Sequence, residues 1–227
     1  MLGKKGPDTA PPMQPYEWTD KKTGQVYAVA DKGIDPGWDY NVGEAANGRT
    51  QALRIMDDTG PWKDLGGFGP DQYGRPDRIP VEATSTMLGS KAATVQELRQ
   101  ALRAAIGGDT THLTDPTGAV TETGHAIVDH ILKDPAKRWN GREQYFTLIP
   151  ELITDPYEIW VTFARSELSG RVALRRKYVK AIRIKGSRSV GLVAEAQGGY
   201  WVGLTFFHGD LRYATSLRKG HMIYGKN

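Results

Sequence analysis

The stretch Tyr178-Val179-Lys180-Ala181-Ile182-Arg183-Ile184 decides the fold class of this chain. Apolar Ile182 and Ile184 alternate with basic side chains, and a period of two is typical of a β-strand. Four further β-prone runs occupy the last third of the chain, at residues 158–163, 190–195, 201–207 and 222–224. Short polar links join these runs, so the sequence predicts an antiparallel sheet of four to five strands.

Helical patterns precede these strands. Thr94 and Glu97 have the spacing of a capping box, and an apolar stripe follows as far as Ile106. Two further helices are expected at about residues 124–133 and 144–153. Helices followed by strands predict an α+β domain in which N-terminal helices pack on one face of an antiparallel sheet.

Residues 1–80 have a different composition. They contain 9 of the 13 prolines, with glycines between them, a composition that disfavours long helices and central strands. One hairpin is expected, with strands at residues 16–19 and 25–29 and a turn that ends at Gly24. We interpret the rest as an extended Pro/Gly-rich arm or linker, so the predicted folded domain comprises residues 81–227.

The composition excludes several kinds of site. The 227 residues include no cysteine, which rules out disulfides, Cys-based metal sites and thiol nucleophiles. There is no apolar run of membrane-spanning length and no secretory signal segment, so no membrane partner is expected. Nucleotide-loop and zinc motifs are also absent. His125 and His130 are five residues apart in a predicted helix and are badly placed to share a metal, so we expect no metal and no cofactor.

Charge is unevenly distributed along the chain. The net charge is +4, but residues 161–227 carry 13 basic and 3 acidic side chains, a net charge of +10. Residues 1–80 and 81–160 are net acidic, at −2 and −4. The basic section would attract a polyanion such as nucleic acid. A solvated basic surface without a partner explains the same charges equally well.

The basic section contains one dense set of polar side chains, which includes Thr205, His208, Tyr213, Arg218 and His221. Arginine suits phosphate oxygens because its guanidinium presents a fork of donors. Cleavage of RNA needs a base for the 2′-hydroxyl, an acid for the leaving 5′-oxygen and cations near phosphorus. The RNA supplies its own nucleophile, so no metal is required. The composition alone supports a basic binding domain as well as it supports an enzyme.

Two stretches resemble phage protein families. Residues 33–43, Gly-Ile-Asp-Pro-Gly-Trp-Asp-Tyr-Asn-Val-Gly, resemble a segment of Mu-type phage minor head proteins, with Trp38 and Val42 where Phe and Pro are usual. In that family the segment follows the main head domain and often leads into an appended enzymatic domain. The resemblance implies a phage or prophage product, in the virion or the bacterial cytoplasm, with capsid or head proteins as partners.

Residues 81–227 are similar to phage members of the barnase–EndoU–colicin–RelE nuclease superfamily. The similarity rests on short pieces: residues 130–133, Arg142, Tyr145, residues 149–153 and 155–160, Arg176, Tyr178, Thr205, residues 218–220 and 222–224. It implies helices on a four- or five-stranded antiparallel sheet. It also implies a metal-independent, toxin-like ribonuclease that leaves a 2′,3′-cyclic phosphate.

The resemblance also implies site residues. His130 is the predicted acid–base residue, with His125 as its substitute if the helix register is shifted. The full predicted catalytic set is His130, Thr205, Arg218, Tyr213 and Arg142. The predicted substrate-binding set is Arg176, Tyr178, Lys180, Lys219 and His221. Arg142, Arg176 and Arg218 would hold phosphate, and Thr205 and Tyr213 would orient the scissile group.

Three hypotheses follow. The chain is an endoribonuclease with RNA as its partner, or it is a phage head or packaging accessory that binds nucleic acid without cleaving it. In the third, the arm docks an immunity protein or a capsid partner that covers the cleft.

Overall fold

The computed structural model describes residues 61–133, 140–168, 170, 172–184, 187–197, 200–209 and 211–226, and the backbone of β1 (Tyr16–Thr19) and β2 (Val26–Val29). β1 and β2 pair antiparallel, which confirms the predicted hairpin. Residues 33–43, which carry the resemblance to head proteins, lie outside the described part of the chain.

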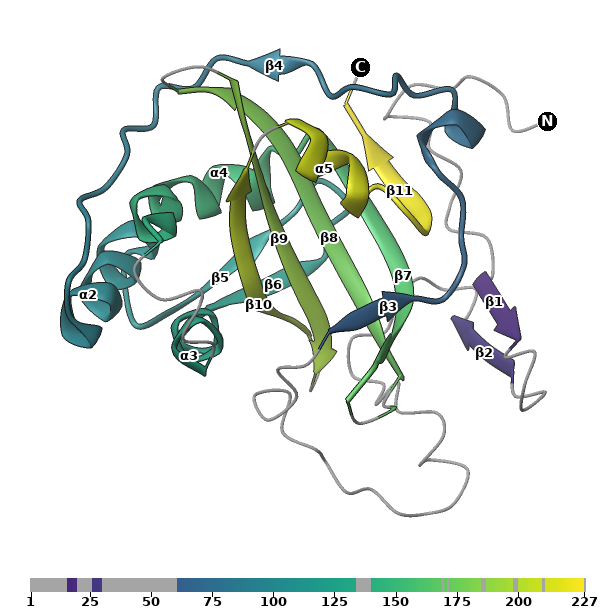
Figure 1. Ribbon diagram of the computed structural model, residues 1–227, viewed down its shortest axis with the longest axis horizontal. Coiled ribbons are helices and arrows are strands. Elements are labelled where there is room, and N and C mark those ends of the chain that lie inside the picture. Colours follow the sequence, from purple (N-terminus) through teal and green to yellow (C-terminus); the bar gives the residue numbers. More distant parts are fainter. Residues whose placement is uncertain are drawn as a thin grey trace.

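The other strands form one nine-stranded sheet (Figure 1). They are β3 (Trp62–Asp64), β4 (Val81–Glu82), β5 (Thr110–Thr114), β6 (Val120–Gly124), β7 (Glu158–Ser166), β8 (Val172–Arg183), β9 (Ser187–Gln197), β10 (Tyr200–Gly209) and β11 (His221–Gly225). The strand order is β11-β7-β8-β9-β10-β6-β5, while β3 pairs with β7 and β4 with β8. Neighbours are antiparallel except for β6 with β10 and β4 with β8.

Strands β7 to β11 confirm the five strands that the sequence predicts. The sheet is nevertheless larger than the predicted four to five strands, because β3, β4, β5 and β6 extend it. These four strands are only two to five residues long. Such short segments show too few alternations to be recognised, and pairing with the long central strands fixes their conformation.

Four helical segments pack on one face of the sheet. They are α2 (Val95–Ile106), α3 (His125–Lys133), the 3-10 helix η5 (Arg142–Leu148) and α4 (Ile149–Thr154). Their apolar side chains share the larger core with Phe163, Tyr178 and Phe206 of the sheet. Among the described residues, no helix is both long and apolar enough to cross a membrane.

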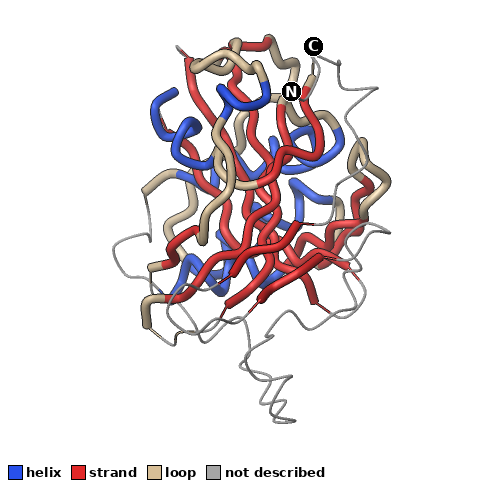
Figure 2. Tube along the Cα trace, turned by 90° about the vertical axis from the view of Figure 1, so that its right-hand side faces the viewer, coloured by secondary structure: helices blue, strands red, loops and turns tan. Residues whose placement is uncertain are grey.

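A further helix, α5 (Leu211–Leu217), packs on the opposite face. Its Ala214 contributes to a second, smaller core with Trp160 and Val179. Seen from the side, the strands form the central layer and helices lie on both sides of it (Figure 2). The sequence predicts helices on one face only; α5 was missed because seven residues are too few to show a helical period.

The predicted capping box at the start of α2 is confirmed. The Thr94 hydroxyl accepts a hydrogen bond from the Glu97 backbone N–H at 3.1 Å, and the Glu97 carboxylate accepts one from the Thr94 N–H at 3.2 Å. Two N–H groups that the helix cannot satisfy are thereby paired. Gly107 ends the helix with a φ of 79°, a conformation that favours glycine.

Residues 61–80 pack on the same sheet as the rest of the chain. β3 pairs with β7, and the backbones of Phe68 and Gly220 bridge each other. Ile79 is buried in the smaller core with Trp160. The sheet therefore includes part of the segment that the sequence analysis assigns to the arm, and the division of the chain at residue 80 stays a prediction.

Candidate functional site

The central contact of the candidate site joins α3 to β10. His130 lies in the last turn of α3, and its Nε2 is 3.1 Å from the Thr205 hydroxyl in β10. Both side chains are partly buried. The helix therefore directs His130 at the sheet, as the predicted catalytic role requires. His125, the predicted substitute, lies at the other end of α3 and is within 4.0 Å of Asp109.

The edge of β10 explains why a helix can reach Thr205. β6 pairs with β10 only at Trp201 and Val202. From Thr205 onward, β9 still pairs with β10 on one side, while α3 and η5 contact the strand as well. Among the described residues no strand covers this edge of β10 beyond Val202, which leaves backbone carbonyls available to side chains.

Arg142 of η5 uses one of these carbonyls. Its Nη1 donates to the backbone oxygen of Phe206 at 3.3 Å, and its Nε donates to the Asn140 side-chain oxygen at 3.0 Å. The side chain is only 8% exposed. These two bonds hold the guanidinium one residue along β10 from Thr205, so the structure brings three predicted catalytic residues together: His130, Thr205 and Arg142.

The same neighbourhood contains an aromatic pair that the predicted site sets omit. The rings of Tyr145 in η5 and His208 in β10 stack, with centroids 4.2 Å apart and planes 13° apart. His208 belongs to the dense polar set in the sequence, and Tyr145 to the pieces that carry the family resemblance. No spacing in the sequence indicates that they meet, because they are 63 positions apart.

Arg218 lies elsewhere. Its guanidinium is fully buried against Glu158 of β7, with Nε donating to Oε2 at 2.6 Å and Nη2 donating to Oε1 at 2.8 Å. Its Nη1 donates to the Asp77 carbonyl at 2.9 Å. β7 is three strands from β10 in the sheet. We therefore leave Arg218 out of the candidate site and assign its contacts to the packing of residues 61–80.

Arg176 and Tyr178 form a second buried group on β8. Both contact the Asp115 carboxylate, and Arg176 also donates to the Tyr178 hydroxyl at 2.9 Å. Burial raises the pKa of Tyr178, so the hydroxyl stays protonated and can donate to Asp115. The group anchors the turn between β5 and β6 to the sheet, and the predicted contact of Arg176 and Tyr178 with a substrate stays a prediction.

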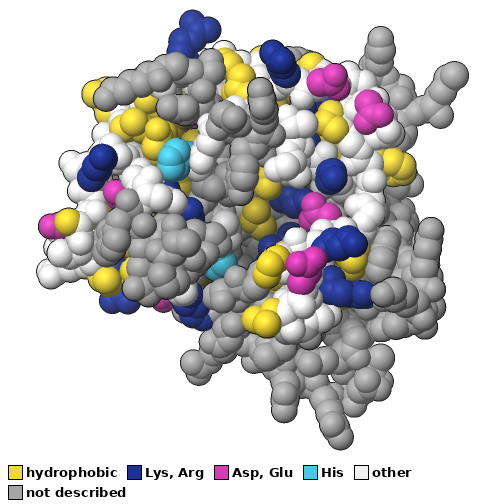
Figure 3. Space-filling model, viewed as in Figure 1, with side chains coloured by type: hydrophobic (Ala, Val, Ile, Leu, Met, Phe, Trp, Pro, Cys, Tyr) yellow, Lys and Arg dark blue, Asp and Glu magenta, His cyan; other side chains and the backbone are white. Residues whose placement is uncertain are grey.

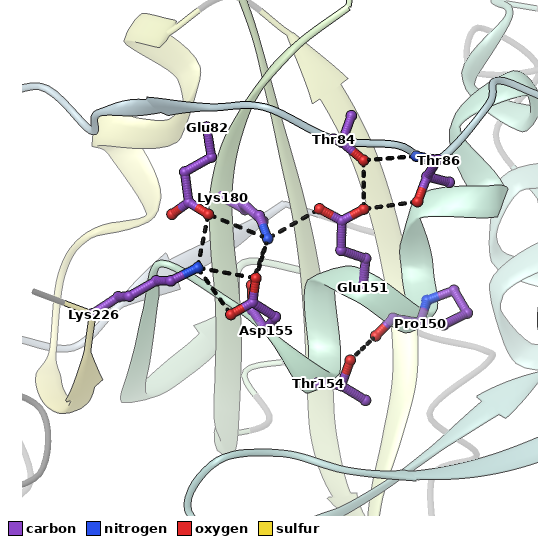
Figure 4. A network of polar contacts seen from close by, with 9 residues as sticks. All are labelled: Glu82, Thr84, Thr86, Pro150, Glu151, Thr154, Asp155, Lys180 and Lys226. Atoms are coloured by element: carbon purple, nitrogen blue, oxygen red, sulfur yellow. Dashed lines mark hydrogen bonds and ion pairs between the residues drawn. The ribbon is translucent and has the colours of Figure 1, made fainter.

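Lys180 is also bound internally, in the network drawn in Figure 4. Its Nζ lies 2.6 Å from Asp155, 3.0 Å from Glu151 and 3.4 Å from Glu82. The side chain is 2% exposed. Burial alone would lower the pKa of Lys180, but hydrogen bonds to the carboxylates outweigh this and raise it above its ordinary value. Lys226 joins the same carboxylates near the C-terminal strand.

The remaining predicted residues are dispersed. His221 of β11 lies 3.1 Å from the Tyr73 hydroxyl, and burial lowers the pKa of its imidazole. Lys219 is exposed, and its backbone oxygen accepts from Lys177 at 3.5 Å. Tyr213 lies in α5, and its side chain is not among those that the structure describes.

These contacts show that many positive charges of the basic C-terminal section lie in ion pairs within the domain. Five of its basic residues are paired with carboxylates from residues 64–158: Arg176, Lys177, Lys180, Arg218 and Lys226. Much of its net charge of +10 is therefore neutralised inside the domain. On the face shown in Figure 3, Lys and Arg side chains alternate with Asp and Glu side chains instead of forming one continuous basic patch.

Among the described residues, no group of three His, Asp or Glu side chains is placed to hold a metal ion. The expectation of chemistry without a metal or cofactor stays a prediction, and the His130–Thr205–Arg142 group can be described without one. His130 of α3 can accept and donate a proton, Thr205 of β10 supplies a hydroxyl, and Arg142 of η5 supplies a fixed positive charge.

Comparison with known proteins adds one finding. A family model described as phage-Barnase-EndoU-ColicinE5/D-RelE like nuclease2 matches residues 97–225, from α2 to β11. The match covers more than half of the chain and includes all of the candidate site. No match was found among curated proteins or among solved structures. None of the comparisons supports the resemblance of residues 33–43 to Mu-type head proteins.

Proposed function

Because the chain belongs to the phage-Barnase-EndoU-ColicinE5/D-RelE like nuclease family, we propose that it is a metal-independent endoribonuclease. The observation that carries the proposal is the 3.1 Å contact between His130 Nε2 and the Thr205 hydroxyl. A histidine is suited to proton transfer near neutral pH. Arg142 is held one residue from Thr205 by the Phe206 carbonyl, where a cation favours phosphate.

In the proposed reaction, His130 takes the proton of the substrate's 2′-hydroxyl. The 2′-oxygen then forms a bond to phosphorus, and the bond from phosphorus to the 5′-oxygen breaks. The leaving 5′-oxygen takes a proton from water, the hydroxide that remains takes the proton back from His130, and the products are a 2′,3′-cyclic phosphate and a 5′-hydroxyl. Thr205 orients the imidazole, and Arg142 balances the negative charge that develops on the phosphate oxygens.

The test compares the purified protein with its His130→Ala variant on total RNA in the presence of EDTA. We expect cleavage by the wild type across pH 5 to 8 and a loss of rate of about 10²- to 10⁴-fold in the variant, the usual contribution of a general acid–base residue. His125→Ala is the matched control, because it changes the other histidine of α3. Salt-dependent binding of RNA without cleavage, equal in all three proteins, would favour a non-catalytic accessory instead.

The biological setting is part of the proposal. The family description links the domain to phage, and the stretch at residues 33–43 supports the same origin. We propose a toxin-like phage or prophage product, in the virion or the bacterial cytoplasm. The arm would bind a capsid, head or immunity protein. Deletion of residues 1–60 should then abolish that association and leave RNA cleavage intact, whereas retained association would remove this part of the proposal.

A further inference from the structure

A second cationic group lies on the same face of the sheet as Thr205. In the strand register, Thr205 stands opposite Val193, and Val193 opposite Lys177. Cross-strand partners share a face of the sheet. Thr205 and Lys177 are separated by β9 alone, which places their backbones about 10 Å apart.

Lys177 lies close to two further cations. Arg175, two positions earlier on β8, points to the same face because side chains alternate along a strand. The backbone oxygen of Lys219, just after α5, is 3.5 Å from Lys177 Nζ. Burial lowers the pKa of Lys177, the Asp64 carboxylate opposes this, and the positive charges of Arg175 and Lys219 lower it further. Lys177 therefore experiences the positive charge of both Arg175 and Lys219.

Two side chains of the neighbouring strand β3 contact this cationic group. Trp62 lies under the Arg175 guanidinium, which is 3.6 Å from the centre of a tryptophan ring. Asp64 pairs with Lys177 Nζ at 2.6 Å. Stacking on a flat ring fixes a guanidinium in one plane and leaves its edge directed outward. β3 thus holds one cation in place and neutralises another.

Positive charge exceeds negative charge in this group. Asp64 is the carboxylate that the described contacts place against Lys177, whereas Arg175 and Lys219 add two further positive charges to the same group. Lys177 is 3% exposed, whereas Arg175 is half-buried and Lys219 is exposed. In Figure 3 the centre of this face, below α5, is hollowed, and Lys and Arg side chains lie along its border among Asp, Glu and apolar side chains. An excess of cations beside a hollow favours an anion.

We propose that Arg175 and Lys219, with Lys177 beneath them, form a subsite for a phosphate that flanks the scissile one in a bound RNA strand. That the bound phosphate belongs to RNA rests on the proposed function. The cationic group is a feature of the structure whatever the function is. A bound strand would run across β9 from the His130–Thr205 contact to Arg175. The subsite would contribute to affinity and leave the chemical step to His130.

The test measures binding of an RNA oligonucleotide in which every 2′-hydroxyl is methylated, so that it cannot be cleaved. Arg175→Gln and Lys219→Gln should each weaken binding at low salt, by about tenfold for Arg175→Gln. Each should also reduce the slope of log affinity against log salt by about 0.7, the loss of one contact to a single-strand phosphate. With cleavable RNA, both variants should raise KM and leave kcat unchanged.

Arg183→Gln is the matched control, because it removes the same charge from an exposed position on the same strand, about 26 Å further along. Equal binding by wild type, Arg175→Gln and Lys219→Gln would overturn the subsite even if RNA is cleaved. If the wild type cleaves no RNA but binding still falls in these two variants and not in Arg183→Gln, the subsite stands and the proposed reaction fails.

Discussion

The imidazole of His130 and the hydroxyl of Thr205 are 75 positions apart in the sequence and 3.1 Å apart in the structure. The β-strand pattern of residues 201–207 does not mark Thr205 as functional, and the helical pattern of residues 124–133 does not mark His130. The family resemblance selected both. Their contact is a property of the fold, created where β6 stops covering the edge of β10.

Thr205→Val removes the hydroxyl at nearly constant volume. We expect kcat on RNA to fall about two- to twelvefold, the effect of one lost hydrogen bond of about 0.5–1.5 kcal/mol, because the imidazole loses its orienting partner. Thr215→Val is the control, since Thr215 is exposed on α5. An unchanged kcat in Thr205→Val would remove Thr205 from the mechanism.

Arg218→Met tests the assignment of a predicted catalytic residue to the packing. Removal of the guanidinium leaves the buried Glu158 carboxylate with fewer partners, so we expect the free energy of unfolding to fall by about 3–5 kcal/mol. Urea denaturation measures this, with exposed Arg183→Met as the control. Unchanged stability together with lost RNA cleavage would return Arg218 to the active site.

At the scale of elements, the approach of residues 66–68 to the segment before β11 is unusually close. Gly220 has a φ of 123°, and a Cβ built on it would lie 2.2 Å from the Val161 carbonyl oxygen. Gly67 approaches the same backbone: its Cβ would lie 2.4 Å from the Gly220 Cα. Glycine is required here because β3 and β11 both pair with β7, and the backbones at Gly67 and Gly220 come into direct contact between them.

Gly220→Ala should therefore destabilise the domain severely, because backbone atoms must move apart. Gly107→Ala is the matched control: its φ is also positive, at 79°, but no atom lies within 4 Å of the added Cβ. We expect a cost of about 1 kcal/mol for the control, from backbone strain alone, and a clearly larger loss of Tm for Gly220→Ala. Equal losses would contradict the close approach.

Elements with a clear local pattern could be predicted from the sequence. The capping box of α2 and the alternation in β8 are local signals, and both elements form as expected. β5, β6 and α5 lack such signals because they are short, and their structure depends on partners far along the chain. For the same reason, the sequence predicts a cationic cleft, whereas Arg176, Lys180 and Arg218 lie in buried ion pairs: charge counts do not show which carboxylates meet which cations.

Across the whole molecule, ion pairs join the acidic sections of the chain to its basic section. Lys180 connects β8 to α4 and to β4 through three carboxylates (Figure 4). Burial alone would raise the pKa of Glu151, but hydrogen bonds from Thr84, Lys180 and Thr86 outweigh it and lower the pKa below 4.5. The pKa of Asp155 is lowered below 3.8 in the same way by Lys180 and Lys226.

This network predicts loss of stability in acid. A carboxyl group whose pKa is lower in the folded state stabilises the fold above its unfolded pKa, and this contribution disappears as the pH falls through the folded pKa. We expect the free energy of unfolding to decrease below about pH 4.5, and the decrease to be smaller in Glu151→Gln. Urea titrations at pH 7, 5, 4 and 3 measure this. A parallel pH dependence in both proteins would contradict the assignment.

In the proposed reaction, His130 activates the 2′-hydroxyl of an RNA substrate. The most direct measurement uses a DNA oligonucleotide that contains a single ribonucleotide, incubated with the protein and EDTA, with analysis of the product ends. We predict one cut, directly after the ribonucleotide, with a 2′,3′-cyclic phosphate and a 5′-hydroxyl, and no cut by His130→Ala. Cleavage of the same oligonucleotide without the ribonucleotide, or an unchanged rate in His130→Ala, would contradict the proposed reaction.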